Sequence, residues 1–416
     1  MCSLMQASKN QYTTDFIIIG AGILGLSTAL KLLDAYPRAK ISILDKEGAV
    51  GEHASGRNSG VLHSGIYYPP DSLKAKLCGE GAKAMRAYCQ EHNLPWNKLG
   101  KVIVPTQTED EDTLRMLYER GLVNGVCVEW LDEVQLAELE PLARTATGRA
   151  LFVPETTVVD PKAIMLHLHQ TLAARGVKFY FNACCEQVDV KTRTVCAGSS
   201  SWHYQHLINT AGLYADKIAE ACGLRHRYTM LPFKGLYYEV KPTSKIKINH
   251  LIYPVPDMNV PFLGIHFTKT VSGKVYVGPT AVPALGREQY RGLKDMNIKE
   301  TLPVLYHLLR QYRHNEQGFR NYTHREVLNF LKPKFVNTAK TLVPSLTSSD
   351  LSLSGKVGIR AQLLDILSCR LVMDFLIEQT DNETHILNAV SPAFTSAFGF
   401  SNYVVGLLET KHCIPA

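Results

Sequence analysis

The sequence lacks the closely spaced cysteine pairs that mark structural zinc sites and many redox centres. Its ten cysteines include no C-x-x-C arrangement, and they are typical of reduced thiols in a large intracellular protein. No block of the chain is rich in lysine and arginine, and a formal net charge of +7 is modest for 416 residues. We therefore expect neither a metal centre nor a nucleic-acid-binding function.

The sequence also lacks an apolar run long enough to span a bilayer. The most apolar stretch, residues 16–30, has about 15 residues, whereas a transmembrane helix needs about 20. Residues 1–14 have neither the apolar core of a secretory signal nor the arginines of a mitochondrial leader. We therefore expect a cytoplasmic protein, for which contact with the cytoplasmic face of an inner membrane would be peripheral.

A glycine-rich turn between two apolar segments organises the first part of the chain. Residues 16–19 read as a β-branched strand, residues 20–25 read Gly-Ala-Gly-Ile-Leu-Gly, and an apolar helix follows. The glycines let a pyrophosphate approach the helix N-terminus, where free N–H groups and the helix dipole favour negative charge. A second strand, residues 41–44, ends in an aspartate 20 residues after the last glycine, where a carboxylate can bind an adenosine ribose. The predicted dinucleotide contacts are Gly20, Ala21, Gly22, Ile23, Gly25 and Asp45.

The residues after the second strand favour FAD over NAD. An NAD-binding domain would continue into its next helix, but residues 53–61 read His-Ala-Ser-Gly-Arg-Asn-Ser-Gly-Val, an extended stretch of small and polar residues. Such residues let backbone amides approach a ligand closely. The stretch resembles the same place in flavoproteins of the glycine-oxidase and D-amino-acid-oxidase superfamily. The cofactor contacts predicted here are Lys46, Ser55, Arg57, Asn58 and Ser59.

Later segments predict further close approaches to the cofactor. The apolar strand at residues 206–209 runs into a small-residue turn and then a helix, which is typical of a nucleotide fold. Residues 355–363 and 391–393 have similar features near the end of the chain, and a short β-meander begins near residue 186. The contacts predicted from these segments are Val188, Ala211, Gly212, Gly358, Arg360, Ser391, Pro392 and Ala393.

These features predict an α/β protein with a Rossmann-like FAD-binding domain and an intercalated α+β substrate domain built on a mainly antiparallel sheet. Residues 294–340 read as helical and rich in His, Arg and Lys. We assign residues 1–90, 146–225 and 350–416 to the FAD-binding domain, and residues 91–145 and 226–349 to the substrate-binding or cap domain.

Eight blocks in order closely resemble the FAD-dependent L-2-hydroxyglutarate dehydrogenase/oxidase family. The resemblance covers nearly the whole chain, and its His-Ser-Gly-Ile-Tyr-Tyr and Gly-Ile-His-Phe-Thr segments are more specific than the glycine turn. It implies oxidation of L-2-hydroxyglutarate to 2-oxoglutarate by hydride transfer to FAD, with electrons passed to a quinone chain or to oxygen. The blocks are residues 20–25, 53–68, 73–78, 232–235, 253–256, 262–268, 358–362 and 388–393.

The implied dicarboxylate substrate needs a proton acceptor and cationic groups that hold its carboxylates. His63 and His266 are both candidates for the base, because imidazole titrates near neutrality, and the sequence leaves the choice open. Arg360 is the leading carboxylate clamp, since a guanidinium grips a carboxylate with two parallel hydrogen bonds. Secondary candidates for the other carboxylate are Tyr67, Tyr253 and Lys234. Lys234 stands where the family pattern leads us to expect Arg. The positive charge is kept, but a lysine cannot form the two parallel hydrogen bonds to a carboxylate that a guanidinium forms.

Three other functions remain open from the sequence. The first is an amino-acid or amine oxidase of the same fold, which often needs no dedicated base. The second is a flavin-binding assembly factor without turnover, because fold does not fix function. The third is oxidation of glycerol 3-phosphate, for which we would expect a clearer set of basic phosphate ligands. The physiological electron acceptor, the oligomeric state and the mode of flavin attachment are not determined by the sequence.

Overall fold

Parallel pairing of apolar strands builds the first large sheet. The structure is a computed structural model that describes residues 10–224 and 227–410. The strands of this sheet are β1 (Asn10–Ile19), β2 (Ile41–Leu44), β9 (Lys178–Tyr180), β10 (Gln187–Asp189), β11 (Thr194–Ala197), β12 (Ser200–Asn209), β20 (Leu376–Gln379) and β21 (Glu383–Asn388). β1 pairs in parallel with both β12 and β2, in the order β10-β11-β12-β1-β2-β9, and β21 joins β12 and β20. This is the Rossmann-like sheet expected from the sequence.

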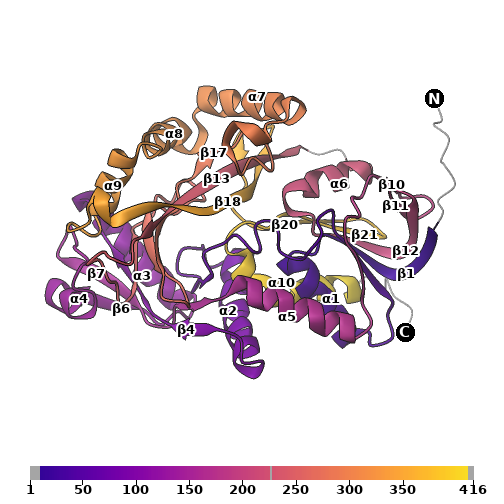
Figure 1. Cartoon of the computed structure of the whole chain (residues 1–416), viewed down its shortest axis with the longest axis horizontal. Helices are drawn as coiled ribbons and strands as arrows, with labels where there is room; N and C mark the ends of the chain where they lie inside the picture. Colours follow the sequence, from indigo (N-terminus) through magenta and orange to yellow (C-terminus); the bar gives the residue numbers. More distant parts are fainter. Residues whose placement is uncertain (1–9, 225–226, 411–416) are drawn as a thin grey trace.

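Helices cover both faces of this sheet (Figure 1). Alternate residues of β1 divide between the two covered faces. Phe16 and Ile18 join the apolar cluster of α1, α2, α5 and α10, whereas Ile17 and Ile19 join a second cluster with Ile218 of α6. A parallel sheet buried on both faces needs unbroken apolar strands, which explains the lack of alternation in this segment. The helices are α1 (Ile23–Ala35), α2 (Leu73–Glu91), α5 (Pro161–Ala174), α6 (Ala215–Ala221) and α10 (Ala393–Thr410).

A second, mainly antiparallel sheet carries the other half of the molecule. Its strands are β5 (Lys101–Val104), β6 (Glu129–Asp132), β7 (Arg149–Val153), β13 (Tyr228–Val240), β14 (Leu251–Pro254), β15 (His266–Lys269), β16 (Val275–Gly278), β17 (Val282–Pro283), β18 (Leu351–Asp365) and β19 (Arg370–Leu371). They follow the order β19-β18-β13-β16-β15-β14-β5-β7-β6, with β17 on β13. The longest pair is β13 with β18, and β5 pairs in parallel with β14.

Five further helices accompany this second sheet, and a small sheet lies at the junction. Figure 1 shows α7, α8 and α9 along one outer side of the molecule, opposite the side that carries α2 and α5. The helices are α3 (Glu111–Val123), α4 (Glu133–Leu139), α7 (Ile298–His314), α8 (Phe319–Leu328) and α9 (Lys332–Lys340). The small sheet has strands β3 (Val61–Leu62), β4 (Trp96–Lys98) and β8 (Thr157–Val159).

The predicted fold class is confirmed, but two predicted domain boundaries differ from the strand pairing. β7 pairs with β5 and β6, and β18 pairs with β13, so both belong to the second sheet. The boundaries at residues 146 and 350 had grouped them with the nucleotide-binding part. Glycine-rich turns locate the cofactor-facing segments, whereas the sheet that a strand joins depends on partners far away in the chain. We keep the division into two domains as a proposal, with β7 and β18 assigned to the substrate-binding domain instead of the FAD-binding domain.

The cysteines and helices of the described residues bear on two expectations from the sequence. All eight described cysteines are free thiols. Cys2 and Cys413 lie outside the described residues, as do most of residues 1–14, in which no leader was expected. No helix in the described ranges is long and apolar enough to cross a membrane.

We expect Gly25→Ala to destabilise the protein strongly. A Cβ at this position would lie 2.0 Å from the carbonyl oxygen of Gly20, so the turn and α1 would have to separate. Overpacking of this kind lowers the free energy of unfolding by about 1–3 kcal/mol. Gly79→Ala is the matched control, because it also lies in a helix but its Cβ would meet nothing within 4 Å. The free energy of unfolding of that control should rise by about 0.5–1 kcal/mol, because alanine is favoured over glycine inside a helix. Thermal unfolding compares the two variants, and equal stability of both would contradict this account of the turn.

Candidate active site

The main cavity lies where the two sheets meet, at the carboxyl ends of the parallel strands. It has a volume of about 620 Å³. Its walls come from the turns after β1, β2 and β12, the segment at residues 53–59, the strand β18 and the start of α10. Ligands of open α/β sheets bind at this edge of the strands. The cavity is therefore the candidate site for both cofactor and substrate.

The glycine turn is held by close backbone contacts that leave no room for side chains. Gly20 has a φ of 107°, and a Cβ there would lie 2.7 Å from the carbonyl oxygen of Thr210. Ser55 Oγ accepts a hydrogen bond from the amide of Ile23, at 2.9 Å, in the first turn of α1. The turn after β1, the turn after β12 and the 53–59 segment thus meet at the N-terminus of α1, where an anionic pyrophosphate is favoured.

Asp45 supports the glycine turn from the end of β2. Its Oδ2 accepts from the amide of Ala21 at 2.7 Å, and its Oδ1 accepts from the amide of Glu47 at 2.9 Å. Burial raises the pKa of Asp45, whereas these two amide bonds oppose the rise. Each carboxylate oxygen has a second lone pair, so Asp45, which lines the cavity, remains suited to accept from ribose hydroxyls.

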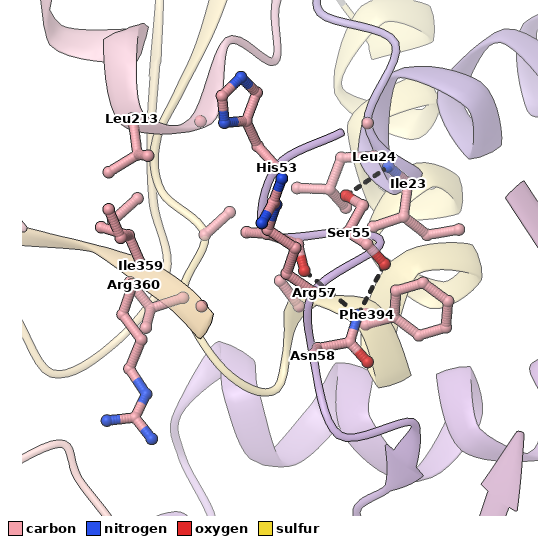
Figure 2. A pocket seen from close by; sticks show the side chains of 18 of the residues that line it. Ile23, Leu24, His53, Ser55, Arg57, Asn58, Leu213, Ile359, Arg360 and Phe394 are labelled. Carbon is pink, nitrogen blue, oxygen red and sulfur yellow. Dashed lines mark hydrogen bonds between the residues drawn. The ribbon is translucent and has the colours of Figure 1, made fainter. Parts of the chain in front are cut away.

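The segment at residues 53–59 faces β18 across the cavity (Figure 2). Asn58 Nδ2 donates to the carbonyl of Ser55 at 2.7 Å, which fixes the loop. The Arg57 guanidinium lies 4.3 Å from the centre of the Tyr290 ring. A Cβ on Gly358 of β18 would lie 3.1 Å from the carbonyl oxygen of Arg57, so this glycine permits the close approach. Figure 2 shows Arg360 on the β18 side of the cavity, across from the segment that carries Arg57 and Asn58.

Most of the residues predicted from the sequence line this one cavity. The cofactor candidates that do so are Gly20, Gly22, Ile23, Asp45, Lys46, Ser55, Arg57, Asn58, Ser59, Ala211, Gly212, Gly358, Arg360, Ser391, Pro392 and Ala393. The substrate candidates that do so are His63, Tyr253, His266 and, again, Arg360. Five predicted residues do not line it: Ala21, Gly25, Tyr67, Val188 and Lys234.

The five residues lie behind the cavity wall for identifiable reasons. Ala21 and Gly25 belong to the inner side of the glycine turn and its helix. Val188 is buried in the core beside Ile17, and the preceding Cys184 and Cys185 line the cavity instead. The contact of Val188 with the cofactor stays a prediction that the cavity lining does not support.

Lys234 and Tyr67 are also placed differently from the expectation. Lys234 on β13 is buried outside the cavity, while its neighbour Gly235 lines the wall, because successive residues of a strand face opposite sides. Burial lowers the pKa of Lys234. Tyr67 is buried behind Tyr253 in a cluster with Ile103. Neither side chain is placed to touch a ligand in the cavity directly.

His266 is oriented as a neutral imidazole with a fixed tautomer. Its Nδ1 lies 2.7 Å from the carbonyl oxygen of Gly264, and its ring stacks on Tyr253 with ring centres 3.9 Å apart. Because a carbonyl oxygen only accepts, Nδ1 carries the hydrogen and Nε2 keeps the lone pair. Burial lowers the pKa of His266 to about 3, and the charges of Arg360 and Lys101 add to the decrease. His266 is therefore unprotonated at neutral pH, with the lone pair on Nε2 free.

His63 is the second neutral imidazole at this end of the cavity. Its backbone amide donates to Thr395 Oγ1 at 3.1 Å, which ties the residue to the start of α10. Its Nδ1 is buried without a hydrogen-bond partner in the described part of the chain. Burial lowers its pKa to about 3, with further contributions from the charges of Lys101 and His266. His63 thus has an unused polar atom but no tautomer fixed by a neighbour.

Lys101 is a buried cation that sequence reasoning missed. It begins β5, is fully buried, and its Nζ has no hydrogen-bond partner among the described residues. The ammonium lies 4.4 Å from the centre of the Tyr67 ring and 5.3 Å from that of Tyr253. Burial lowers its pKa to about 7. A lysine that starts an apolar strand was the one signal in the sequence, and alone it does not distinguish a buried lysine from an exposed one.

Arg360 completes a site that favours an anionic ligand. Its Nη1 is buried and has no hydrogen-bond partner within the described ranges, and its guanidinium lies 5.4 Å from the centre of the Phe262 ring. Arg360 and Lys101 both act on His266, and Lys101 also acts on His63, while Arg360 Nη1 and Lys101 Nζ have no hydrogen-bond partner among the described residues. Leaving buried charges unpaired is costly, so an anion bound here would remove that cost.

The predicted cofactor contact Lys46 belongs to a polar cluster at the cavity wall whose other members sequence reasoning missed. Lys46 Nζ lies 2.6 Å from Glu288 Oε1 and also contacts Glu47. His53 bridges Glu47, through Nε2 at 2.8 Å, and the Tyr290 hydroxyl, through Nδ1 at 2.9 Å. These contacts join the end of β2 to the loop before α7. They hold the two halves of the molecule together beside the glycine turn.

Comparison with protein families and curated relatives agrees over nearly the whole chain. The model of the family described as FAD dependent oxidoreductase (DAO) matches residues 15–407. L-2-hydroxyglutarate dehydrogenase of Escherichia coli K12 is 36% identical over 405 residues, which cover 95% of this chain and 93% of the relative. The mitochondrial L-2-hydroxyglutarate dehydrogenase of Homo sapiens is 33% identical over 430 residues, covering 97% and 90%.

Solved structures show the same fold at low sequence identity. An L-α-glycerophosphate oxidase from Mycoplasma pneumoniae with FAD bound aligns with a TM-score of 0.75 at 21% identity and covers 95% of both chains. A glycine oxidase from Geobacillus kaustophilus aligns with a TM-score of 0.70 at 16% identity, covering 96% of this chain and 95% of its own. At these identities the likeness supports the fold alone.

We expect Lys101→Met to raise the melting temperature at pH 7. The pKa of Lys101 is lower in the folded protein, at about 7, than in an unfolded chain, at about 10.4. The unfolded chain therefore binds this proton more tightly, so the cost of burial is complete below pH 7 and fades as the pH rises toward 10.

The measurement is thermal unfolding of wild type and Lys101→Met from pH 7 to pH 10, without substrate. The difference in melting temperature should shrink as the pH rises. Lys178→Met, an exposed change on β9, serves as the control and should show no such trend. A variant less stable than wild type at pH 7 would show that Lys101 is paired in solution.

Proposed function

The chain belongs to the DAO family of FAD-dependent oxidoreductases, and on this premise we propose that it oxidises L-2-hydroxyglutarate to 2-oxoglutarate. Relatives named L-2-hydroxyglutarate dehydrogenase, at 33–37% identity over nearly the full length, support this substrate. The observation that carries the proposal is that a neutral, tautomer-fixed His266 and Arg360 line one cavity, with the buried Lys101 behind Tyr253 in its wall.

The residues of the cavity fit FAD, the cofactor of this family. The Gly20–Gly22 turn and the N-terminus of α1 suit its pyrophosphate, and Asp45 suits its adenosine ribose. The 53–59 segment and the turn at Ala211 would hold the rest of the molecule. When bound, FAD accepts the two electrons and the hydrogen that leave the α-carbon of the substrate.

Arg360 would bind the carboxylate beside the hydroxyl-bearing carbon. Its buried guanidinium lines the cavity and offers a bidentate pair of donors. Lys101 does not line the cavity, but its charge acts across Tyr253 and favours a dianion at this end. Tyr253 and His63 are the nearest candidates for hydrogen bonds to the second carboxylate. Lys234 and Tyr67 are less suited, because both lie behind the wall.

His266 would act as the general base. Its Nε2 has the lone pair that accepts the hydroxyl proton as the carbinol becomes a ketone. The Gly264 carbonyl stabilises the protonated ring through Nδ1–H, and the stack on Tyr253 keeps the ring in place. A bound carboxylate beside the ring would raise its pKa from about 3, which makes the transfer more favourable in the complex.

The charge of the site argues against an amine as the substrate. An amine or amino acid brings an ammonium group, which would be repelled by the positive charges of Arg360 and Lys101. Glycerol 3-phosphate is also an anion, so charge does not exclude it.

We propose a quinone or oxygen as the electron acceptor of the reaction. Peripheral contact with a membrane is part of the same proposal.

The test of the proposed function is anaerobic reduction of the FAD-loaded protein, followed by the loss of flavin absorbance. L-2-hydroxyglutarate should bleach the flavin, and D-2-hydroxyglutarate should not. L-lactate, glycine and glycerol 3-phosphate complete the panel. Bleaching by glycine would overturn the substrate assignment, and bleaching by glycerol 3-phosphate alone would replace it with a phosphate ester. No bleaching by any of these would favour a flavin-binding role without turnover.

We expect His266→Gln to slow flavin reduction by L-2-hydroxyglutarate by about 10²–10⁴-fold, because general-base catalysis contributes about that much. FAD should stay bound, since His266 lies at the opposite end of the cavity from the glycine turn. The control is His203→Gln, at an exposed residue of β12 whose Nδ1 also contacts a backbone carbonyl, that of Thr192, at 3.0 Å. Stopped-flow reduction measures both, and an unchanged rate for His266→Gln would transfer the role to His63.

A further inference from the structure

Exposed apolar side chains are concentrated in one short segment of the described chain. Of 21 exposed large apolar side chains, 11 lie between residues 296 and 331, in and around α7 and α8. Single exposed apolar residues are normal, but a contiguous set marks an interaction surface. They are Met296, Ile298, Leu302, Leu305, Tyr306, Leu309, Tyr312, Val327, Leu328, Phe330 and Leu331. We call this set the α7–α8 face.

The apolar stripe of α7 points away from the protein. Ile298, Leu302 and Leu309 are 73%, 62% and 61% exposed, and their spacing places them on one side of the helix. Only Val304 and Gln311 of this helix are buried. A helix that packs on a core normally buries its apolar stripe, so α7 is oriented for a partner outside the chain.

The end of α8 and the turn after it extend the same kind of surface. Val327, Leu328, Phe330 and Leu331 are all at least half exposed. Figure 1 shows α7, α8 and α9 along one outer side of the molecule, opposite α2 and α5. The partner would therefore meet this side without contact to the helices of the nucleotide-binding sheet.

The charges within this segment are mostly positive. The acidic residues among residues 296–334 are already engaged: Glu300 accepts from the amide of Arg287, Glu316 pairs with Arg370, and Glu326 is buried and accepts from the amide of Ala281. The basic residues are Lys299, Arg310, Arg313, Arg320, Arg325, Lys332 and Lys334. Apolar residues flanked by Lys and Arg suit the headgroup region of an anionic bilayer.

We propose that the α7–α8 face docks the protein onto an anionic lipid bilayer. In a symmetric contact between two copies of this chain, the basic residues of both faces would lie close together and repel each other. This repulsion disfavours a second copy as the partner. An anionic bilayer removes that repulsion and covers the apolar stripe. Since no described helix can span a membrane, the contact lies on the bilayer surface.

The docked helix would lie next to the wall of the cavity. Thr301 Oγ1 donates to the carbonyl of Leu285 at 2.8 Å, and the Glu300 carboxylate accepts from the Arg287 amide at 3.0 Å. These bonds attach the first turn of α7 to the loop that carries Glu288, which lines the cavity. Docking would thus bring the site close to an electron acceptor dissolved in lipid, and this part of the inference rests on the proposed function.

The test is co-sedimentation of the FAD-loaded full-length protein with vesicles. One set contains phosphatidylcholine alone, and the other contains phosphatidylcholine with phosphatidylglycerol. Wild type should bind the anionic vesicles, bind neutral vesicles at least tenfold less, and dissociate as salt is raised. Leu302→Glu/Leu309→Glu should lose at least tenfold in binding. The matched control is Val134→Glu/Leu353→Glu, two equally exposed positions on other elements, which should bind as wild type does.

The outcomes separate docking from catalysis. Failure of wild type to bind anionic vesicles, or equal binding by the Leu302/Leu309 variant, would overturn the proposal. Light scattering that shows a wild-type dimer and a monomeric variant would assign the face to a second copy and also overturn it. Turnover with L-2-hydroxyglutarate and a water-soluble dye should be the same in all three proteins, which confirms that they are folded. Vesicle binding without any dye turnover would leave docking supported and the proposed function refuted.

Discussion

The antiparallel pairing of β13 with β18 is the interaction on which the geometry of the site depends. It sets Phe233 opposite Arg360 and Gly235 opposite Gly358. Without side chains at the two glycines, β18 passes close to the carbonyl of Arg57, and β13 passes close to Pro279. This pairing brings Arg360, the proposed carboxylate-binding residue, to the cavity that begins at the glycine turn. It thereby joins the cofactor-binding part and the substrate-binding part into one site.

The electrostatics of the inner end of the cavity follow from that placement. Lys101 is buried near both imidazoles and Arg360 lies near His266, and burial together with these positive charges keeps both imidazoles neutral. The same arrangement leaves Arg360 Nη1 and Lys101 Nζ without a hydrogen-bond partner in the described part of the chain, which prepares this region for an anionic ligand. A neutral base beside uncompensated positive charge is the combination that oxidation of a hydroxy acid requires, since the base removes a proton while the cations hold the carboxylates.

Much of the nucleotide-binding half was predictable because its signals are local. The β-branched run at residues 16–19, the glycines that follow it and the cap-and-proline start of α5 at Asp160 each restrict the backbone within a few residues. The sites expected along these turns do line one cavity. Val188 and Lys234 were expected at the cavity but do not line it, for the opposite reason. The side to which a strand residue points depends on where pairing begins, and the local sequence does not specify this.

The sequence by itself determined the order of elements, the backbone positions that exclude side chains, and the residue types available for chemistry. Only the tertiary structure decided that Lys101 is buried, because its cover comes from the parallel pairing of β5 with β14 and from Tyr67 and Tyr253. Which side of α7 faces the solvent was also decided only by the tertiary structure. Its apolar stripe is visible in the sequence, but whether the stripe faces the core or the solvent depends on the elements packed beside it. Burial is a property of contacts between distant segments, so residue spacing alone does not fix it.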